Sequence, residues 1–108
     1  MSGFFLSSFT MKLFCVYILY SPSTNGFYIG QTEDFEKRLE EHNNHKYESS
    51  HTSRASDWEE FFVLKCTTRR QAILIEKHIK KARKRKYLED LKTYPEISQK
   101  LLARYLEM

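Results

Sequence analysis

A chain of 108 residues has room for one domain, because its apolar residues are too few to supply two separate cores. The composition is 41% hydrophobic and 15% aromatic with only 3 glycines and 2 prolines, which excludes a fibrous or intrinsically disordered chain. The net charge of +4 is a mild excess that many proteins without a polyanionic partner share, so its distribution along the chain is more informative.

The first predicted elements form a β-hairpin. Residues 13–20 read LFCVYILY, and this uncharged run of strand-forming residues predicts a strand buried on both faces. Residues 21–26 contain a proline and an Asn-Gly pair, which predict a turn. Residues 27–30 (FYIG) then predict a short second strand that pairs antiparallel with the first.

A helix and a polar loop are predicted to follow the hairpin. Thr32 is the predicted N-cap, because two acids come directly after it and suit the positive end of a helix dipole. Phe35 and Leu39 lie one turn apart and predict the buried side of a helix that ends near residue 43. Residues 43–57 are polar and lack periodicity, so we interpret them as a mobile loop.

The second half of the chain predicts one more strand and then helices. Residues 58–66 (WEEFFVLKC) predict the third strand, and residues 68–71 (TRRQ) fit a capping box that opens a long helix. Its inner face is predicted from apolar residues at helical spacing, Ala72, Ile75, Ile79 and Ala82. Leu88 and Leu91 predict a shorter helix, and Pro95 separates it from a last one.

The order β-β-α-β-α-α, with a last helix after it, predicts an α+β fold in which helices flank a three-stranded antiparallel sheet. We expect residues 1–11 to be an N-terminal extension, 12–92 the domain, and 93–108 a helix packed on it. Cys15 and Cys66 lie in strands without metal-type spacing, which indicates reduced core residues of a cytoplasmic protein. No run approaches the roughly 20 apolar residues of a membrane span.

Two tyrosines of the hairpin are candidate site residues. Tyr17 and Tyr28 lie in strands joined by a short turn, so we expect them to come close together. Gly30 closes the second strand and leaves room there for a ligand or another backbone. The alternative is that both tyrosines are ordinary packed aromatic residues, which is the commoner role of a single strand tyrosine.

Three charged or titratable residues on the predicted helices could complete a site. Arg38 and His42 are four residues apart on one helix face, where they could bind phosphate and exchange a proton, although an exposed pair has the same spacing. Glu76 falls in the apolar stripe of the long helix, where a carboxylate is costly unless it is paired or binds a metal. A plain ion pair with Lys80 is the competing interpretation.

A basic run follows Glu76 without any acid in it. Its cations are Lys77, Lys80, Lys81, Arg83, Lys84, Arg85 and Lys86. Such a run is typical of a surface that neutralises nucleic-acid phosphates. A solvated helix face is the alternative.

The sequence Val16-Tyr17-Ile18, followed across the turn by Tyr28-Ile29-Gly30, resembles the paired motif of the GIY-YIG nuclease superfamily. That family places an arginine on the first helix and a histidine or tyrosine one turn later, where this chain has Arg38 and His42. Its metal-binding glutamate lies on the following long helix and is matched by Glu76.

The resemblance covers roughly residues 12–91, and the basic run is similar to that of small stand-alone bacterial members related to the nuclease domain of the excision-repair incision subunit. The first motif begins with Cys15 in place of glycine, which leaves the Tyr17 hydroxyl unaffected. Gln31 replaces a lysine of the repair relatives, so we expect a phosphate contact there to be weaker or supplied by another residue.

The resemblance implies an endonuclease that hydrolyses DNA with a single Mg²⁺ or Mn²⁺ ion. Glu76 would hold the metal and Arg38 the scissile phosphate. One tyrosine would act as general base, with His42 relaying the proton. We favour Tyr17 as the base and Tyr28 as the residue that positions water and phosphate.

The partners implied are duplex or branched DNA and no membrane. The basic run and Gln31 would contact the nucleic acid, together with loop 43–57. We expect structure-selective or weakly specific cleavage, in repair or recombination, with a protein partner to supply specificity. The alternatives are a catalytically silent nucleic-acid-binding domain of this fold, and an interaction domain in which the tyrosines and Glu76 are structural.

Overall fold

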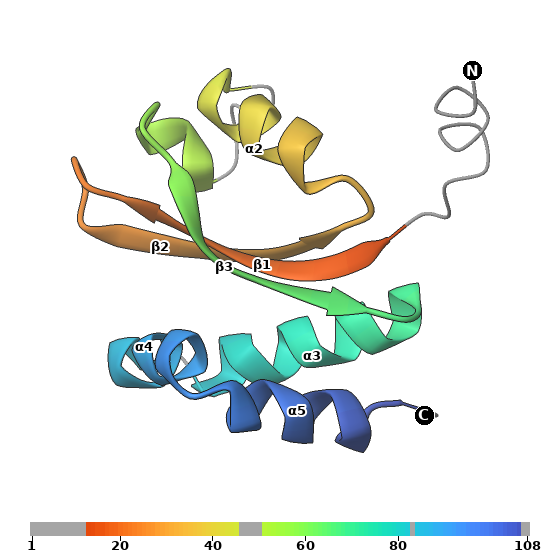
Figure 1. Ribbon diagram of the computed structural model, residues 1–108. Coiled ribbons are helices and arrows are strands. Elements are labelled where there is room, and N and C mark those ends of the chain that lie inside the picture. The colour runs from red at the N-terminus through yellow and green to blue at the C-terminus, as the bar shows by residue number, and fades with distance from the viewer. Residues whose placement is uncertain (1–12, 46–50, 83, 107–108) are drawn as a thin grey trace, which may run out of the picture.

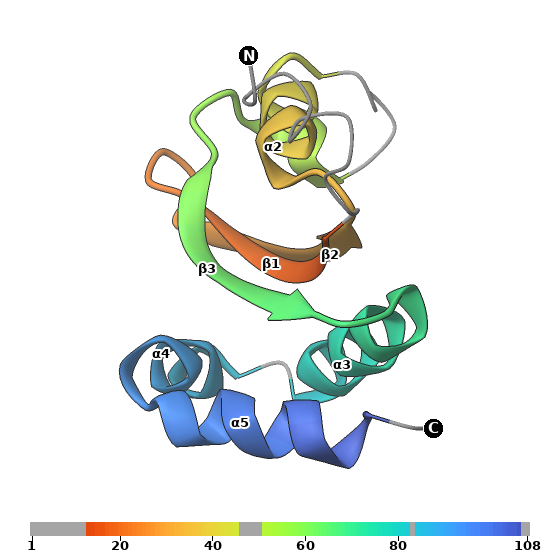
Figure 2. The same cartoon turned by 45° about the vertical axis from the view of Figure 1, so that its right-hand side comes forward.

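The computed structural model describes residues 13–45, 51–82 and 84–106 (Figure 1). Three antiparallel strands form one sheet in the order β2-β1-β3, namely β1 (Phe14–Ser21), β2 (Gly26–Thr32) and β3 (Glu59–Cys66). Helix α2 (Phe35–Asn43) covers one face of the sheet. The other face is covered by α3 (Arg69–Ala82), α4 (Arg85–Thr93) and α5 (Pro95–Arg104), which Figure 2 shows from a second direction. The predicted α+β fold is confirmed.

Strand β1 is the centre of the sheet, and the predicted burial of both its faces is confirmed from Cys15 to Leu19. Its pairing with β2 extends from Ser21↔Gly26 to Cys15↔Thr32, so β2 is longer than the predicted segment 27–30. The added residues are Gly26, Gln31 and Thr32, and they are extended because β1 continues beside them. On the other side, a register shift near Ile18 interrupts the pairing with β3.

The alternation of side chains along β1 divides the interior into two clusters. Val16 and Ile18 point toward α3 and pack against a group that includes Ile75. Tyr17 and Leu19 point the other way, toward α2, and form the second cluster. The face of the sheet on which each candidate residue lies therefore follows from its position in the strand.

The N-cap of α2 differs from the prediction. Asp34 is the cap, and its carboxylate accepts a hydrogen bond from the Lys37 amide at 3.2 Å. Thr32 belongs to β2, and its hydroxyl accepts a hydrogen bond from the Asp34 amide at 3.1 Å. Asp and Thr are both good caps, so the sequence could not choose between them.

The capping box predicted for α3 is half confirmed. The Thr68 hydroxyl accepts a hydrogen bond from the Gln71 amide at 3.0 Å, as expected. The Gln71 side chain, however, accepts from the amide of Thr67 at 2.8 Å, one residue before the predicted partner.

The segment predicted as an unstructured loop contains a short 3-10 helix, η1 (His51–Arg54). Thr52 and Ala55 are buried, and the side chain of Asn43 makes two hydrogen bonds to the backbone of Trp58. The described part of the segment is thus packed on the sheet, and residues 46–50 of the prediction lie outside the described residues.

Helix α5 packs on the rest of the domain through the buried side chain of Leu101. Both cysteines are buried and do not form a disulfide. Over the ranges that the structure describes, none of the helices is both long and apolar enough to cross a membrane.

Candidate active site

The Tyr17 hydroxyl is the centre of the candidate site, on the face of the sheet that α2 covers. Its oxygen lies 2.9 Å from Nε2 of His42, and the Arg38 guanidinium donates a second hydrogen bond to it. The rings of Tyr28 and His42 are also in contact, with centroids 4.8 Å apart. Tyr17, Arg38 and His42 therefore meet at one hydroxyl oxygen, and Tyr28 lies beside them through ring contacts.

The reason for Gly30 differs from the one expected. Gly30 pairs directly with Tyr17 across the two strands, and a Cβ atom added to it would lie 2.5 Å from the Tyr17 hydroxyl oxygen. The space that the glycine leaves is thus filled by the phenol of Tyr17. Glycine is required so that this hydroxyl can lie against the backbone of β2.

His42 is almost completely buried and is held from both ring nitrogens. Nε2 faces Tyr17, and Nδ1 lies 2.8 Å from the hydroxyl of Thr52. Burial, together with the positive charge of Arg38, lowers the pKa of His42 to about 4. The imidazole is therefore neutral near pH 7, and each of its nitrogens can take part in a hydrogen bond.

Thr52 is a site residue that the sequence interpretation missed. It lies in η1, is buried, and contacts His42 through its hydroxyl. Its neighbours in the sequence are polar and without periodicity, so no local signal distinguishes it. The contact exists only because the segment after α2 folds back onto the sheet.

The Tyr17 phenol stays protonated well above neutral pH. Burial raises its pKa most, and the charge of an ionised Tyr28 raises it further. Arg38 lowers this pKa through its charge and its hydrogen bond, but does not reverse the effect of burial. The hydroxyl is consequently a hydrogen-bond donor and acceptor in the resting protein.

Glu76 lies on α3, where it is both largely buried and paired with Lys80. Its side chain is only 17% exposed, as expected for the margin of an apolar stripe, and its Oε2 lies 2.7 Å from Nζ of Lys80. The negative charge of Glu76 also raises the pKa of Tyr17, so the two groups are within electrostatic range. The carboxylate is thus turned inward and at the same time paired.

The Glu76 carboxylate suits a hydrated divalent cation. Within the described ranges, no group of three or more His, Cys, Asp or Glu side chains could hold a metal by protein ligands alone. Mg²⁺, however, is commonly bound by one or two carboxylates, water and a substrate phosphate. Glu76 fits that role, and Gln31 provides a buried Oε1 without a hydrogen-bond partner in the described part of the chain. Strand alternation puts Gln31 on the face that α3 covers.

The predicted basic run is divided between two helices. Lys77, Lys80 and Lys81 are exposed on α3, and Lys84 is the N-cap of α4. Arg85 donates a hydrogen bond to the carbonyl of Asn25 at 2.9 Å, so it holds the turn between β1 and β2. The side chain of Lys86 pairs with Asp90 at 3.1 Å. Arg83 lies outside the described residues.

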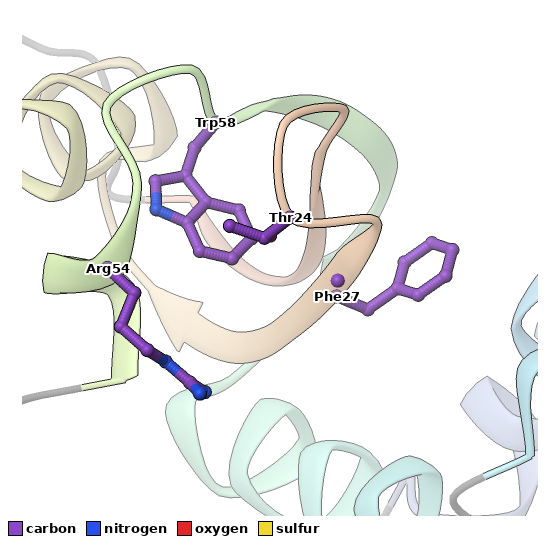
Figure 3. Close-up of a pocket in the computed structure, with 5 residues that line it drawn as sticks. Thr24, Phe27, Arg54 and Trp58 are labelled. Carbon is purple, nitrogen blue, oxygen red and sulfur yellow. The ribbon is translucent and has the colours of Figure 1, made fainter.

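A pocket of about 220 Å³ lies beside the turn between β1 and β2. Thr24 and Gly26 line it from the hairpin, and Arg54 and Trp58 line it from the segment before β3. Figure 3 shows the indole of Trp58 next to Thr24, while the ring of Phe27 points away from both. Gly26 and Tyr28 lie on the same face of β2, and Trp58 belongs to the same buried cluster as Tyr17.

Comparison with protein families identifies the family of this chain. The model of the GIY-YIG catalytic domain matches residues 13–88. The chain belongs to this family. Its fold is therefore a nuclease-type fold, and the family consists generally of endonucleases. Comparisons with curated proteins and with solved structures gave no match. The GIY-YIG match ends in α4, so α5 lies beyond it.

Proposed function

We propose that this GIY-YIG protein is an endonuclease that hydrolyses DNA phosphodiester bonds with one divalent metal ion. The observation that carries the proposal is the meeting of Tyr17, Arg38 and His42 at one hydroxyl oxygen, in a chain of this family. Ordinary core packing would not require a guanidinium and an imidazole on the same buried phenol.

Arg38 is the residue that binds the scissile phosphate in this proposal. Its guanidinium is half-buried, pairs with Glu41 at 3.5 Å and donates to the Tyr17 hydroxyl, so its direction is fixed before substrate arrives. A guanidinium held in this way can stabilise the charge that grows on phosphate oxygens in the transition state.

Tyr28 is the phenol that contacts the attacking water. The sequence favours Tyr17 for the role of base, but Tyr17 is completely buried and its pKa is raised. Tyr28 retains solvent exposure and lies beside His42, so its hydroxyl can accept a hydrogen bond from water and orient it. Tyr17 then positions Arg38.

His42 orients the Tyr17 hydroxyl. A pKa of about 4 makes the imidazole a weak base at neutral pH, so we assign it a hydrogen bond in place of the proton relay that the resemblance implies. In this arrangement Nε2 accepts a hydrogen bond from the Tyr17 hydroxyl, and Nδ1–H donates one to the Thr52 hydroxyl. The lone pairs of the Tyr17 oxygen can then accept a hydrogen bond from Arg38.

Glu76 holds the metal in this proposal, and Gln31 is a second candidate oxygen ligand. A bound Mg²⁺ or Mn²⁺ would stabilise the negative charge of the phosphate and of the leaving 3′ oxygen. The Lys80 ammonium must move from the carboxylate for this site to form. Once released, Lys80 can contact a phosphate itself.

Glu76→Gln tests the proposal, because it removes the negative charge while keeping the shape of the side chain. We expect metal-dependent cleavage to fall on the order of 100-fold or more, with the unfolding temperature close to that of wild type. Glu89→Gln, at an exposed position of α4, is the matched control and should cut normally. Equal cleavage by Glu76→Gln and wild type would refute the assigned role.

A catalytically silent nucleic-acid-binding domain of the same fold is the second candidate. The observation that favours it is the 2.7 Å ion pair that occupies the Glu76 carboxylate. The two candidates differ in one outcome, since a silent domain binds DNA but shows no metal-dependent cleavage of nicked, branched or single-stranded substrates.

A further inference from the structure

A second pocket, of about 350 Å³, lies between α3 and α5, on the side of the molecule away from α2. Figures 1 and 2 both show these two helices side by side under the sheet. Leu74, Lys77, His78 and Lys81 line the pocket from α3, and Arg104 and Tyr105 line it from the end of α5. None of these residues belongs to the candidate active site.

The lining of this pocket is strongly basic. Lys77, Lys81 and Arg104 contribute three positive charges, and no acid is among the described residues that line it. The Arg104 guanidinium lies over the ring of Tyr105, with 5.4 Å from its carbon to the ring centroid. A pocket with this charge attracts an anion, because binding one relieves the mutual repulsion of the cations.

His78 is held inside this group of cations. Its Nδ1 lies 3.0 Å from the Tyr105 hydroxyl, and its ring is near that of Tyr87. The contact with Tyr105 joins α3 to the end of α5 at the pocket, so an anion held by Lys81 and Arg104 would lie beside the imidazole.

The surface of α3 connects this pocket with the candidate metal ligand. At 100° per residue, Glu76 and Lys80 lie on one flank of the buried stripe and His78 lies on the other. Lys77 and Lys81 occupy the outer side between the two flanks, where both are exposed. A row of cations thus leads around the helix from Glu76 to Arg104.

We propose that the pocket between α3 and α5 binds a backbone phosphate of the nucleic-acid substrate, at a distance from the phosphate that is cleaved. The choice of nucleic acid as ligand rests on the proposed function, whereas the phosphate chemistry follows from the three cations. Arg104 and Tyr105 lie beyond residues 13–88, so the site is an addition that α5 makes to the GIY-YIG domain.

The first test follows the His78 imidazole by NMR, in metal-free buffer so that no cleavage can occur. The probes are inorganic phosphate and a short DNA duplex, and His78→Gln identifies the signal. We expect both probes to shift the His78 resonances, because an anion held among Lys77, Lys81 and Arg104 changes the electric field at the imidazole. A shift with inorganic phosphate alone would overturn the assignment to a nucleic-acid backbone, and no shift with either probe would overturn the pocket.

The second test measures duplex binding against salt concentration. Lys81→Ala with Arg104→Ala is compared with a control of equal net charge, Lys65→Ala with Lys92→Ala, whose cations are exposed and outside the pocket. We expect the pocket variant to bind roughly tenfold more weakly and its salt slope to fall by about 1 for each lost phosphate contact. Equal affinities and slopes for the two variants would contradict the proposal.

These tests are independent of catalysis. A wild-type protein that binds duplex through this pocket but never cuts it would refute the endonuclease while supporting the phosphate site. Loss of cleavage in Glu76→Gln, together with unchanged DNA binding by the pocket variant, would support the endonuclease and refute the phosphate site.

Discussion

At the scale of single residues, the chemistry of the site depends on a buried phenol beside a neutral imidazole. Burial raises the pKa of Tyr17 and lowers that of His42, so neither group carries a charge near pH 7. The hydrogen bond between them therefore joins two neutral groups, and the Arg38 guanidinium beside it carries a positive charge that Glu41 faces at 3.5 Å. An anion such as a phosphate is the natural ligand for that charge.

The low pKa of His42 predicts a loss of stability in mild acid. Its folded value of about 4 is below its ordinary 6.5, so the unfolded chain takes up the proton first as the pH falls. The stabilisation is complete above 6.5 and declines toward 4. We expect the free energy of unfolding to fall by about 2 kcal/mol between pH 7.5 and pH 5, measured by urea unfolding. The His42→Gln variant should lose this decline and keep only the part that comes from His78, whose pKa burial also lowers.

Thr52→Val should destabilise the protein, because it leaves Nδ1 of His42 buried without its 2.8 Å partner. We expect a loss of about 1–3 kcal/mol in urea unfolding, together with a change in the nitrogen chemical shifts of His42 that reports its tautomer. Thr93→Val, at the exposed end of α4, is the control. Unchanged shifts in Thr52→Val would show that Thr52 does not orient the imidazole.

Gly30→Ala should damage the site more than Gly26→Ala. The added Cβ would meet the Tyr17 hydroxyl at 2.5 Å in the first variant and the exposed Thr24 hydroxyl at 3.2 Å in the second. Tyr17 is buried and cannot move away without breaking its bond to His42, whereas Thr24 can rotate. We expect about 1–3 kcal/mol of destabilisation and strongly reduced cleavage for Gly30→Ala alone. Similar losses in both variants would contradict this explanation.

At the scale of elements, sequence patterns predicted the strands and helices but not all of their limits. The uncharged run of β1 and the spacing of Ala72, Ile75 and Ile79 express local periodicity, which a sequence displays directly. The end of β2 at Thr32 depends instead on pairing with β1, and the two candidate caps of α2 are chemically alike. A single segment of sequence shows neither its pairing with a distant strand nor which of two similar residues caps a helix.

The residues of the candidate site were predictable from the sequence, but not all of their contacts. The motif tyrosines, Arg38, His42 and Glu76 followed from the resemblance, and the structure brings the first four together and puts Glu76 within electrostatic range. Thr52 and the true neighbour of Gly30 were not predictable, because both depend on contacts between elements distant in sequence.

The ion pair on α3 gives a prediction for metal binding. Lys80→Ala removes the ammonium that lies 2.7 Å from the Glu76 carboxylate and leaves this group available to a cation. Because Lys80 is half exposed, its loss should change stability by less than about 1 kcal/mol. We expect the apparent affinity for Mg²⁺, measured by calorimetry in the absence of DNA, to rise. Lys77→Ala, on the same helix, is the control, and equal affinities for the two variants would contradict competition between Lys80 and the metal.

At the scale of the whole molecule, the sheet separates two functions. The face under α2 carries the tyrosines, Arg38 and His42, and the helices on the opposite face carry Glu76 and the exposed cations of α3. Substrate would reach both faces at the edge of the sheet formed by β2, because this strand carries Tyr28 and also contacts α3. A domain of this size has little surface beyond these contacts for reading bases, which is why we expect structure-selective or weakly specific cleavage.

Nicking of supercoiled plasmid DNA by the purified protein tests the central claim most directly. We expect open-circular product with Mg²⁺ or Mn²⁺ and none after chelation, with a rate on the order of 100-fold lower for Arg38→Ala. Lys37→Ala, the adjacent exposed cation on α2, should nick like wild type. Absence of product with either metal, or equal rates for Arg38→Ala and wild type, would contradict the account.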